Sequence, residues 1–173
     1  MTESYSRTAN LLGALALAMA DLIREATEGP ADGLAASEPA ALVTLAHYPG
    51  QSILSLGRTL GLTHSGAVRL VGRMEQAGLI HRAAAGPGRT LALSLTGAGR
   101  AAADRVLARR QAAVEDVVGR LDASELDAAD RLASRLLAGL TTDRRSARRL
   151  CRLCAEPVCT GPAGCPVDQA AGA

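Results

Sequence analysis

Apolar side chains recur every three or four residues near the start of the chain. This spacing predicts a helix that ends near residues 29–30, with one face formed by Leu11, Leu15, Met19, Leu22 and Ala26. Asp21 ends the apolar run of this helix after about half of the roughly 20 residues that a membrane-spanning helix requires. Glu3 also spoils the basic start of a signal peptide. We therefore expect a cytoplasmic protein.

Three further helices are predicted before residue 78. Ser37 is the expected N-cap of the first, which Pro49 and Gly50 close. The other two cover residues 53–60 and 63–77, and only Gly61 and Leu62 separate them. Two helices joined by a tight glycine-containing turn are typical of a helix-turn-helix.

After the helix at residues 63–77, the chain has two short segments with the pattern of β-strands. Residues 79–82 and 90–95 read as two strands joined by a Gly-Pro-Gly reversal, a hairpin with Arg89 at its tip. Thr96 then caps a long helix toward Arg120, and Asp122 to Glu125 has the spacing of a capping box for a final helix. The apolar stripe of that helix is Leu126, Ala129, Leu132, Leu136 and Leu140.

These patterns predict a mainly α fold with a small β-hairpin wing, a winged helix-turn-helix. The expected parts are an N-terminal dimerisation helix (1–36), a winged helix-turn-helix DNA-binding domain (37–96), C-terminal dimerisation helices (97–142), and an Arg-rich segment with a cysteine tail (143–173). The terminal helices have more apolar face than one small domain can cover. We therefore expect a homodimer formed through these helices.

The formal net charge is only +2, so the position of the charges matters more than their sum. Five arginines and one acidic residue, Glu75, fall between residues 53 and 91. A helix that reads the major groove needs hydrogen-bonding side chains in its first turn and basic groups one and two turns later. The candidate DNA-binding residues are therefore Thr63, His64, Ser65, Gly66, Arg69, Arg73 and Arg89, while Val68, Leu70 or Val71, and Met74 face the core.

Residues 54–95 resemble the MarR family. The likeness rests on Leu60-Gly61-Leu62-Thr63, Val68-Arg69-Leu70-Val71, Met74-Glu75, Ala77-Gly78-Leu79-Ile80, Arg82 and Leu93-Ser94-Leu95-Thr96, in this order. It implies a homodimer that binds a pseudo-palindromic operator in double-stranded DNA, usually a repressor released by a ligand or an oxidant. Ser65, Gly66 and Arg69 match recognition-helix positions, and Arg89 matches the wing-tip arginine. The acidic residues common beside that arginine are absent from residues 84–88.

All four cysteines fall within fifteen residues, as Cys151-x2-Cys154-x4-Cys159-x5-Cys165. In a cytosolic chain such a cluster more often binds metal than forms disulfides. Three alternatives stay open: an iron-sulfur cluster that senses redox or cluster status, a structural zinc ion, and reversible thiol oxidation without metal. The motif is similar to the C-terminal cluster motif of the superoxide-response regulator in the MerR family, which favours iron-sulfur.

Motifs for catalysis are missing from the sequence. It has no phosphate loop, no HExxH and no serine in a Gly-flanked elbow, so we expect no enzyme. Two alternatives to a metal-controlled regulator remain. One is the same regulator with a small-molecule effector between the dimer helices and the DNA-binding lobe. The other is a helical dimer that binds proteins through its Arg-rich helix and cysteine tail.

Overall fold

The computed structural model describes residues 2–28, 34–84, 91–160 and 164–172. The described chain is mainly helical, with a two-stranded antiparallel sheet. In chain order its elements are α1 (Thr2–Thr27), α2 (Glu38–His47), α3 (Ile53–Leu60), α4 (His64–Gln76), β1 (Ile80–Ala84), β2 (Leu91–Leu95), α5 (Gly97–Val118), α6 (Ala123–Leu140), α7 (Arg144–Leu150), α8 (Glu156–Cys159) and α9 (Pro166–Gly172).

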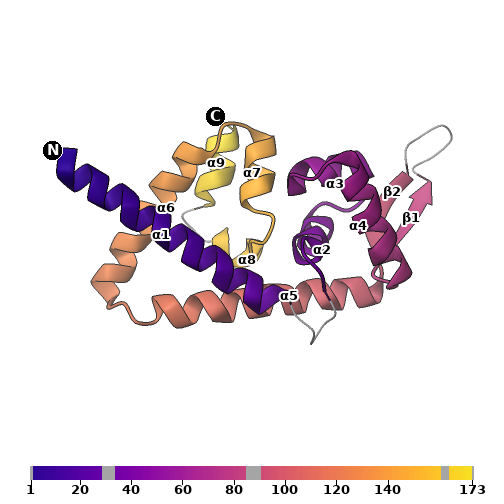
Figure 1. Cartoon of the computed structure of the whole chain (residues 1–173), viewed down its shortest axis with the longest axis horizontal. Helices are drawn as coiled ribbons and strands as arrows, with labels where there is room; N and C mark the ends of the chain where they lie inside the picture. The colour runs from indigo at the N-terminus through magenta and orange to yellow at the C-terminus, as the bar shows by residue number, and fades with distance from the viewer. Residues whose placement is uncertain (1, 29–33, 85–90, 161–163, 173) are drawn as a thin grey trace.

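The long helix α5 runs along the molecule, and the other elements gather over its two ends (Figure 1). Helices α2, α3 and α4 with the β1–β2 hairpin form the winged helix-turn-helix at one end, and α1 packs against α5. Helices α7, α8 and α9, here called the C-terminal lobe, follow α6. Because α9 contacts α6 and α7, while α7 contacts α3, this lobe folds back onto the helix-turn-helix.

The core lies in the winged helix-turn-helix and the adjoining part of α5. Its largest fully buried side chains include Leu42, Leu45, Leu56, Leu70 and Met74. Removing such side chains from water is the main stabilising contribution to a domain of this size, at about 25 cal/mol per Å² of apolar surface. The core therefore fixes the orientation of α4 against α2 and α3.

Local sequence fixes most helix starts. The expected caps Thr63, Thr96 and Asp122 each accept a capping hydrogen bond from a backbone N–H, and Asp122 forms the full capping box with Glu125. Ser52, which was not predicted, caps α3 in the same way. The expectation for Ser37 is wrong. Its backbone is left-handed, with φ 71°, and its side chain makes no capping bond. The Glu38 carboxylate instead accepts the Ala35 N–H at 3.0 Å.

The hairpin pairs Ile80 with Leu95 and Ala84 with Leu91, close to the expected strands. Val68 does not face the core as expected, because 40% of it is exposed, and Ala67 takes the buried position instead. The C-terminal segment contains the expected Arg-rich helix, α7, and also two short helices, α8 and α9. Helix α7 begins at a capping box in which Asp143 accepts the Ser146 N–H at 2.6 Å.

Helices α1 and α6 leave large apolar side chains on the surface of the single chain. Leu15 and Leu17 of α1 are 52% and 72% exposed, and Leu132 and Leu140 of α6 are 52% and 64% exposed. No residue of α6 is buried. Within the described residues, no helix has both the length and the apolar character that crossing a bilayer requires.

Candidate functional site

Helix α4 presents one side to the core and the other to solvent. Ala67, Leu70, Val71 and Met74 are buried. Thr63, His64, Ser65 and Arg69 are exposed on the opposite side, and Gly66 is half-buried between them. The Thr63 hydroxyl accepts the Gly66 N–H at 3.1 Å, which fixes the first turn of the helix. The structure therefore brings these five expected DNA-contacting residues together on one surface.

Arg73 differs from the other expected contacts because it has a partner inside the protein. Its Nε donates to Glu38 Oε1 at 3.1 Å, and the Glu38 side chain is only 8% exposed. This ion pair ties α4 to α2, so the guanidinium compensates a buried carboxylate. Sequence analysis could not detect it because the two residues are 35 positions apart.

The expected wing arginine, Arg89, lies outside the described residues. In the described part of the hairpin, Arg82 Nη2 lies 3.0 Å from Glu75 Oε2. This ion pair holds β1 against the end of α4.

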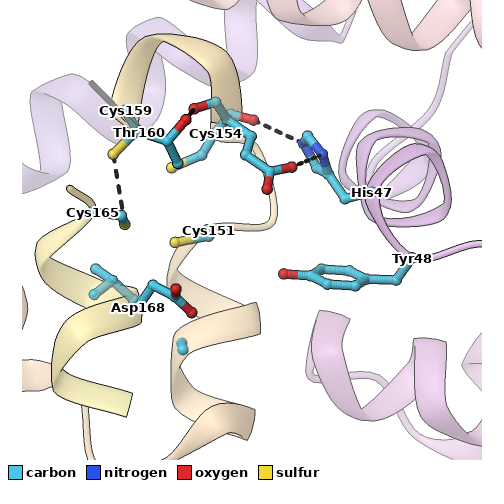
Figure 2. A pocket seen from close by; sticks show the side chains of 11 residues that line it. His47, Tyr48, Cys151, Cys154, Cys159, Thr160, Cys165 and Asp168 are labelled. Carbon is cyan, nitrogen blue, oxygen red and sulfur yellow. Dashed lines mark hydrogen bonds and ion pairs between the residues drawn. The ribbon is translucent and has the colours of Figure 1, made fainter. Parts of the chain in front are cut away.

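All four cysteines line one pocket of about 120 Å³ in the C-terminal lobe. Figure 2 shows their side chains directed toward the same space between α7, α8 and the start of α9. The Cys159 and Cys165 sulfurs are 3.7 Å apart, and the Cys151 and Cys154 thiols are close enough to shift each other's pKa in opposite directions. Among the described residues, no group of three or more His, Cys, Asp or Glu is placed to hold a metal ion as it stands. The cysteines therefore form two pairs.

The thiol pKa values differ within these pairs. The hydrogen bond from the Cys151 thiol lowers the pKa of Cys154 to about 6, and the positive charges of Arg110 and His47 act in the same direction. The same hydrogen bond, with burial, raises the pKa of Cys151. Burial, followed by the hydrogen bond with Cys165, raises the pKa of Cys159 to about 11. Within this pair, the pKa of Cys154 therefore lies below that of Cys151.

His47 connects the lobe to the winged helix-turn-helix. From the end of α2, its Nε2 lies 3.0 Å from the Cys154 carbonyl oxygen and its Nδ1 lies 3.0 Å from Glu156 Oε2 (Figure 2). Next to it, the guanidinium carbon of Arg148 lies 4.8 Å from the centre of the Tyr48 ring. His47 and Tyr48 are not among the site residues expected from the sequence. No local pattern marks the contact between α2 and the cysteine segment, where His47 and Cys154 are 107 positions apart.

A larger cavity of about 480 Å³ adjoins the lobe. Helices α1, α2, α3, α5 and α7 contribute to its walls, with Met19, Ile23 and Leu60 supplying apolar surface and Arg110 a charge. Cys154 lines this cavity as well as the cysteine pocket. The two spaces are therefore neighbours.

Residues 32–90 match the model of the MarR family. Solved structures of this family have the same fold. A MarR family protein from Bacillus stearothermophilus aligns with a TM-score of 0.68 at 22% identity, over 79% of this chain and 94% of that one. Rv2887 of Mycobacterium tuberculosis, in complex with DNA, aligns with a TM-score of 0.59 at 28% identity, over 72% of this chain and 96% of that one. The winged helix-turn-helix segment of the chain therefore belongs to the MarR family.

The predicted resemblance to the MarR family of winged helix-turn-helix transcriptional regulators is confirmed over this segment. A regulator of the family from Silicibacter pomeroyi also aligns, with a TM-score of 0.60 at 23% identity, over 79% of this chain and 92% of that one. No curated protein matches the sequence. The family match ends at residue 90, so it does not include the four cysteines.

Proposed function

We propose that this MarR protein is a dimeric, sequence-specific DNA-binding repressor whose operator affinity depends on a metal centre in the C-terminal lobe. The observation that supports DNA binding is the exposed face of α4, where His64, Ser65 and Arg69 surround a capped first turn. Such a turn brings hydrogen-bonding groups to the edges of bases in the major groove. Rv2887, which is similar over most of its length, was solved with DNA bound.

The dimer is proposed from the uncovered apolar faces of α1 and α6. A monomer would leave Leu15, Leu17, Leu132 and Leu140 in contact with water, at about 25 cal/mol for each Å² of apolar surface. Pairing two copies through these helices buries these faces and presents two α4 helices to two half-sites. Two such helices match the symmetry of a pseudo-palindromic operator.

The proposed metal centre is an iron-sulfur cluster bound by Cys151, Cys154, Cys159 and Cys165. Tetrahedral metal–sulfur bonds of about 2.3 Å place two ligand sulfurs of one metal about 3.8 Å apart. Cys159 and Cys165, at 3.7 Å, have this spacing, and Cys151 and Cys154 form the second pair. Two pairs suit a two-iron cluster with one pair on each iron. A single zinc ion would need all four sulfurs around one point.

The first experiment is purification without oxygen, followed by an absorption spectrum and assays of iron, sulfide and zinc. We expect broad absorption at roughly 320 to 460 nm, with about two irons and two sulfides per chain. The control is Cys154→Ser/Cys159→Ser, which should be colourless but still folded. A colourless wild-type protein with one zinc per chain would indicate a structural zinc ion instead of the cluster. A protein without metal would favour reversible thiol oxidation at these cysteines.

A small-molecule effector is a second candidate, favoured by the 480 Å³ cavity beside Cys154. An apolar ligand with an acidic group would suit its Met19, Ile23 and Leu60 walls and the charge of Arg110. If such a ligand releases the protein from DNA without changing its metal content, ligand binding in this cavity controls DNA binding.

DNA binding is tested with a duplex that the wild-type protein selects from a random-sequence pool. Selective, salt-sensitive binding is the expected result. Failure to bind any duplex would contradict the proposal and favour the alternative of a helical protein-interaction module.

A further inference from the structure

Helices α3 and α7 form a cluster of positive charge outside the recognition helix. Arg58 of α3 and Arg144, Arg145 and Arg148 of α7 line a groove of about 280 Å³ together with Ser55 and Thr59. In the described part of the chain, none of these arginines forms an ion pair with a carboxylate. We call these four residues and Arg149 the arginine ridge.

The ridge concentrates like charge, which the described chain offsets only in part, through the Asp143 carboxylate near Arg145 and the Tyr48 ring against Arg148. Four guanidinium groups around one groove repel one another, and this repulsion costs folding free energy. An anion in the groove would remove that cost. The Ser55 and Thr59 hydroxyls already hydrogen-bond within the chain, to Gln51 and to the Ser55 carbonyl, so the guanidinium groups supply the free donors.

The position of α7 indicates which anion this is. Helix α7 packs on α3, the first helix of the helix-turn-helix, and Arg149 packs on the turn that follows it. A Cβ at Gly61 would lie 2.5 Å from Arg149 Nη1. Only Leu62 stands between Gly61 and Thr63, the N-cap of α4. The ridge therefore extends from the groove to the turn that precedes the DNA-reading end of α4.

In a helix-turn-helix complex the first helix crosses the phosphate backbone while the second enters the major groove. Phosphate oxygens are the partners for which arginine is best suited, because its planar fork can bind two of them at once. An element that lies along the first helix and carries unpaired arginines is placed to contact the same backbone.

We propose that the arginine ridge is a second DNA contact, in which α7 binds the phosphates beside each half-site that α4 reads. This inference rests on the proposed DNA-binding function and adds a contact from outside the winged helix-turn-helix. Phosphate contacts give affinity without sequence preference. The ridge therefore sets how tightly the protein holds DNA of any sequence, and α4 sets which sequence it prefers.

The test compares full-length wild-type protein with Arg144→Gln/Arg145→Gln/Arg148→Gln. Dissociation constants are measured between about 50 and 200 mM salt, on the selected duplex and on a scrambled duplex of equal length. We expect the slope of log affinity against log salt to become shallower by about 5, because the dimer loses three arginines from each of two α7 helices and each lost phosphate contact removes about 0.9. Affinity should fall by the same factor on both duplexes.

The matched control is Arg120→Gln/Arg131→Gln/Arg135→Gln, which removes three exposed positive charges at the end of α5 and along α6. It should leave the slope close to that of wild type. Arg58→Gln tests the α3 side of the groove and should reduce the slope by about 2, because each dimer has two copies of Arg58. Glutamine keeps helix propensity close to that of arginine, and circular dichroism checks that each variant is folded.

The outcomes separate the two proposals. A wild-type protein that binds neither duplex overturns the proposed function and the ridge with it. A wild-type protein that binds DNA while the α7 variant behaves like the control overturns the ridge alone. A variant that loses affinity only for the selected duplex also overturns it, since that result would mean base reading by α7.

Discussion

The imidazole of His47 lies 3.0 Å from the backbone carbonyl oxygen of Cys154, although the two residues are 107 positions apart. Only 15% of the His47 side chain is exposed, and its second nitrogen faces the Glu156 carboxylate. One side chain at the end of α2 therefore holds the cysteine segment against the winged helix-turn-helix. This contact joins the two parts that the proposed function couples, the cysteine pocket and the DNA-binding end of the molecule.

His47→Ala should loosen the C-terminal lobe while the winged helix-turn-helix stays folded. Losing a partly buried hydrogen bond and leaving the Cys154 carbonyl without its partner costs on the order of 1–2 kcal/mol. Trypsin should therefore cleave after the α7 arginines about tenfold faster, because local opening exposes them. Mass spectrometry of timed digests measures the rate at each site.

The control for this variant is His81→Ala, since His81 is an exposed residue of β1. It should leave cleavage in α7 unchanged. Equal cleavage rates in wild type and His47→Ala would mean that the α3–α7 and α6–α9 contacts hold the lobe without His47.

Arg69 and Arg73 should respond differently to replacement by alanine although they are one turn apart. Arg69 is exposed, so Arg69→Ala should weaken binding to the selected duplex by on the order of 1–3 kcal/mol and relax its specificity. Arg73→Ala leaves the buried Glu38 carboxylate unpaired. It should lower the free energy of unfolding by about 1–3 kcal/mol.

Urea unfolding and duplex titration separate these two effects. Each substitution is the control for the other, because both remove one arginine from α4. If Arg69→Ala binds the selected duplex with wild-type affinity, Arg69 does not contact the bases. Arg73→Ala with wild-type stability would mean that the ion pair with Glu38 contributes nothing to the fold.

The sequence predicts elements whose causes are local. Thr63 and Asp122 each cap a helix within three residues, so the starts of α4 and α6 follow from spacing alone. The capping box of Asp143 and Ser146 is also local, and its Asp-x-x-Ser spacing marks the start of the Arg-rich helix α7.

Contacts between distant segments account for what sequence analysis missed. Arg73 was assigned to DNA because nothing near it in the chain identifies Glu38 as its partner. The cysteine spacing predicted a shared site, but not that it divides into two pairs beside α2. Both results depend on how α2 packs, which the core determines.

Gly61→Ala should displace α7 from the helix-turn-helix. The φ of Gly61 is +70°, a left-handed conformation that costs other residues roughly 1–2 kcal/mol, and the added Cβ would meet the Arg149 guanidinium. We expect lower stability and faster trypsin cleavage after Arg149. Gly61→Ala/Arg149→Ala should remove the clash but keep the backbone strain, so it should recover only part of the stability.

Gly72→Ala is the control for this prediction. Gly72 lies within α4 with nothing within 4 Å of an added Cβ. It should therefore stabilise the protein by about 0.5–1 kcal/mol. If Gly61→Ala and Gly61→Ala/Arg149→Ala are equally stable, the contact between Arg149 and the turn at Gly61 does not hold α7 in place.

Alkylation of the metal-free protein should distinguish the cysteines by pH. The thiolate is the reactive form, so modification of Cys154 by iodoacetamide should reach half its maximum near pH 6, whereas Cys159 requires a pH near 11. Cys151→Ala removes the thiol that donates to Cys154, so the midpoint of Cys154 should move to higher pH. Peptide mass spectrometry from pH 5 to 9 measures the Cys154 midpoint in wild type and in Cys151→Ala, and it shows whether Cys159 stays largely unmodified up to pH 9. If Cys154 and Cys159 are alkylated with the same pH midpoint, near that of an ordinary cysteine, the paired arrangement is contradicted. If all four thiols become protected from alkylation after reconstitution with iron and sulfide, they are the ligands of the cluster.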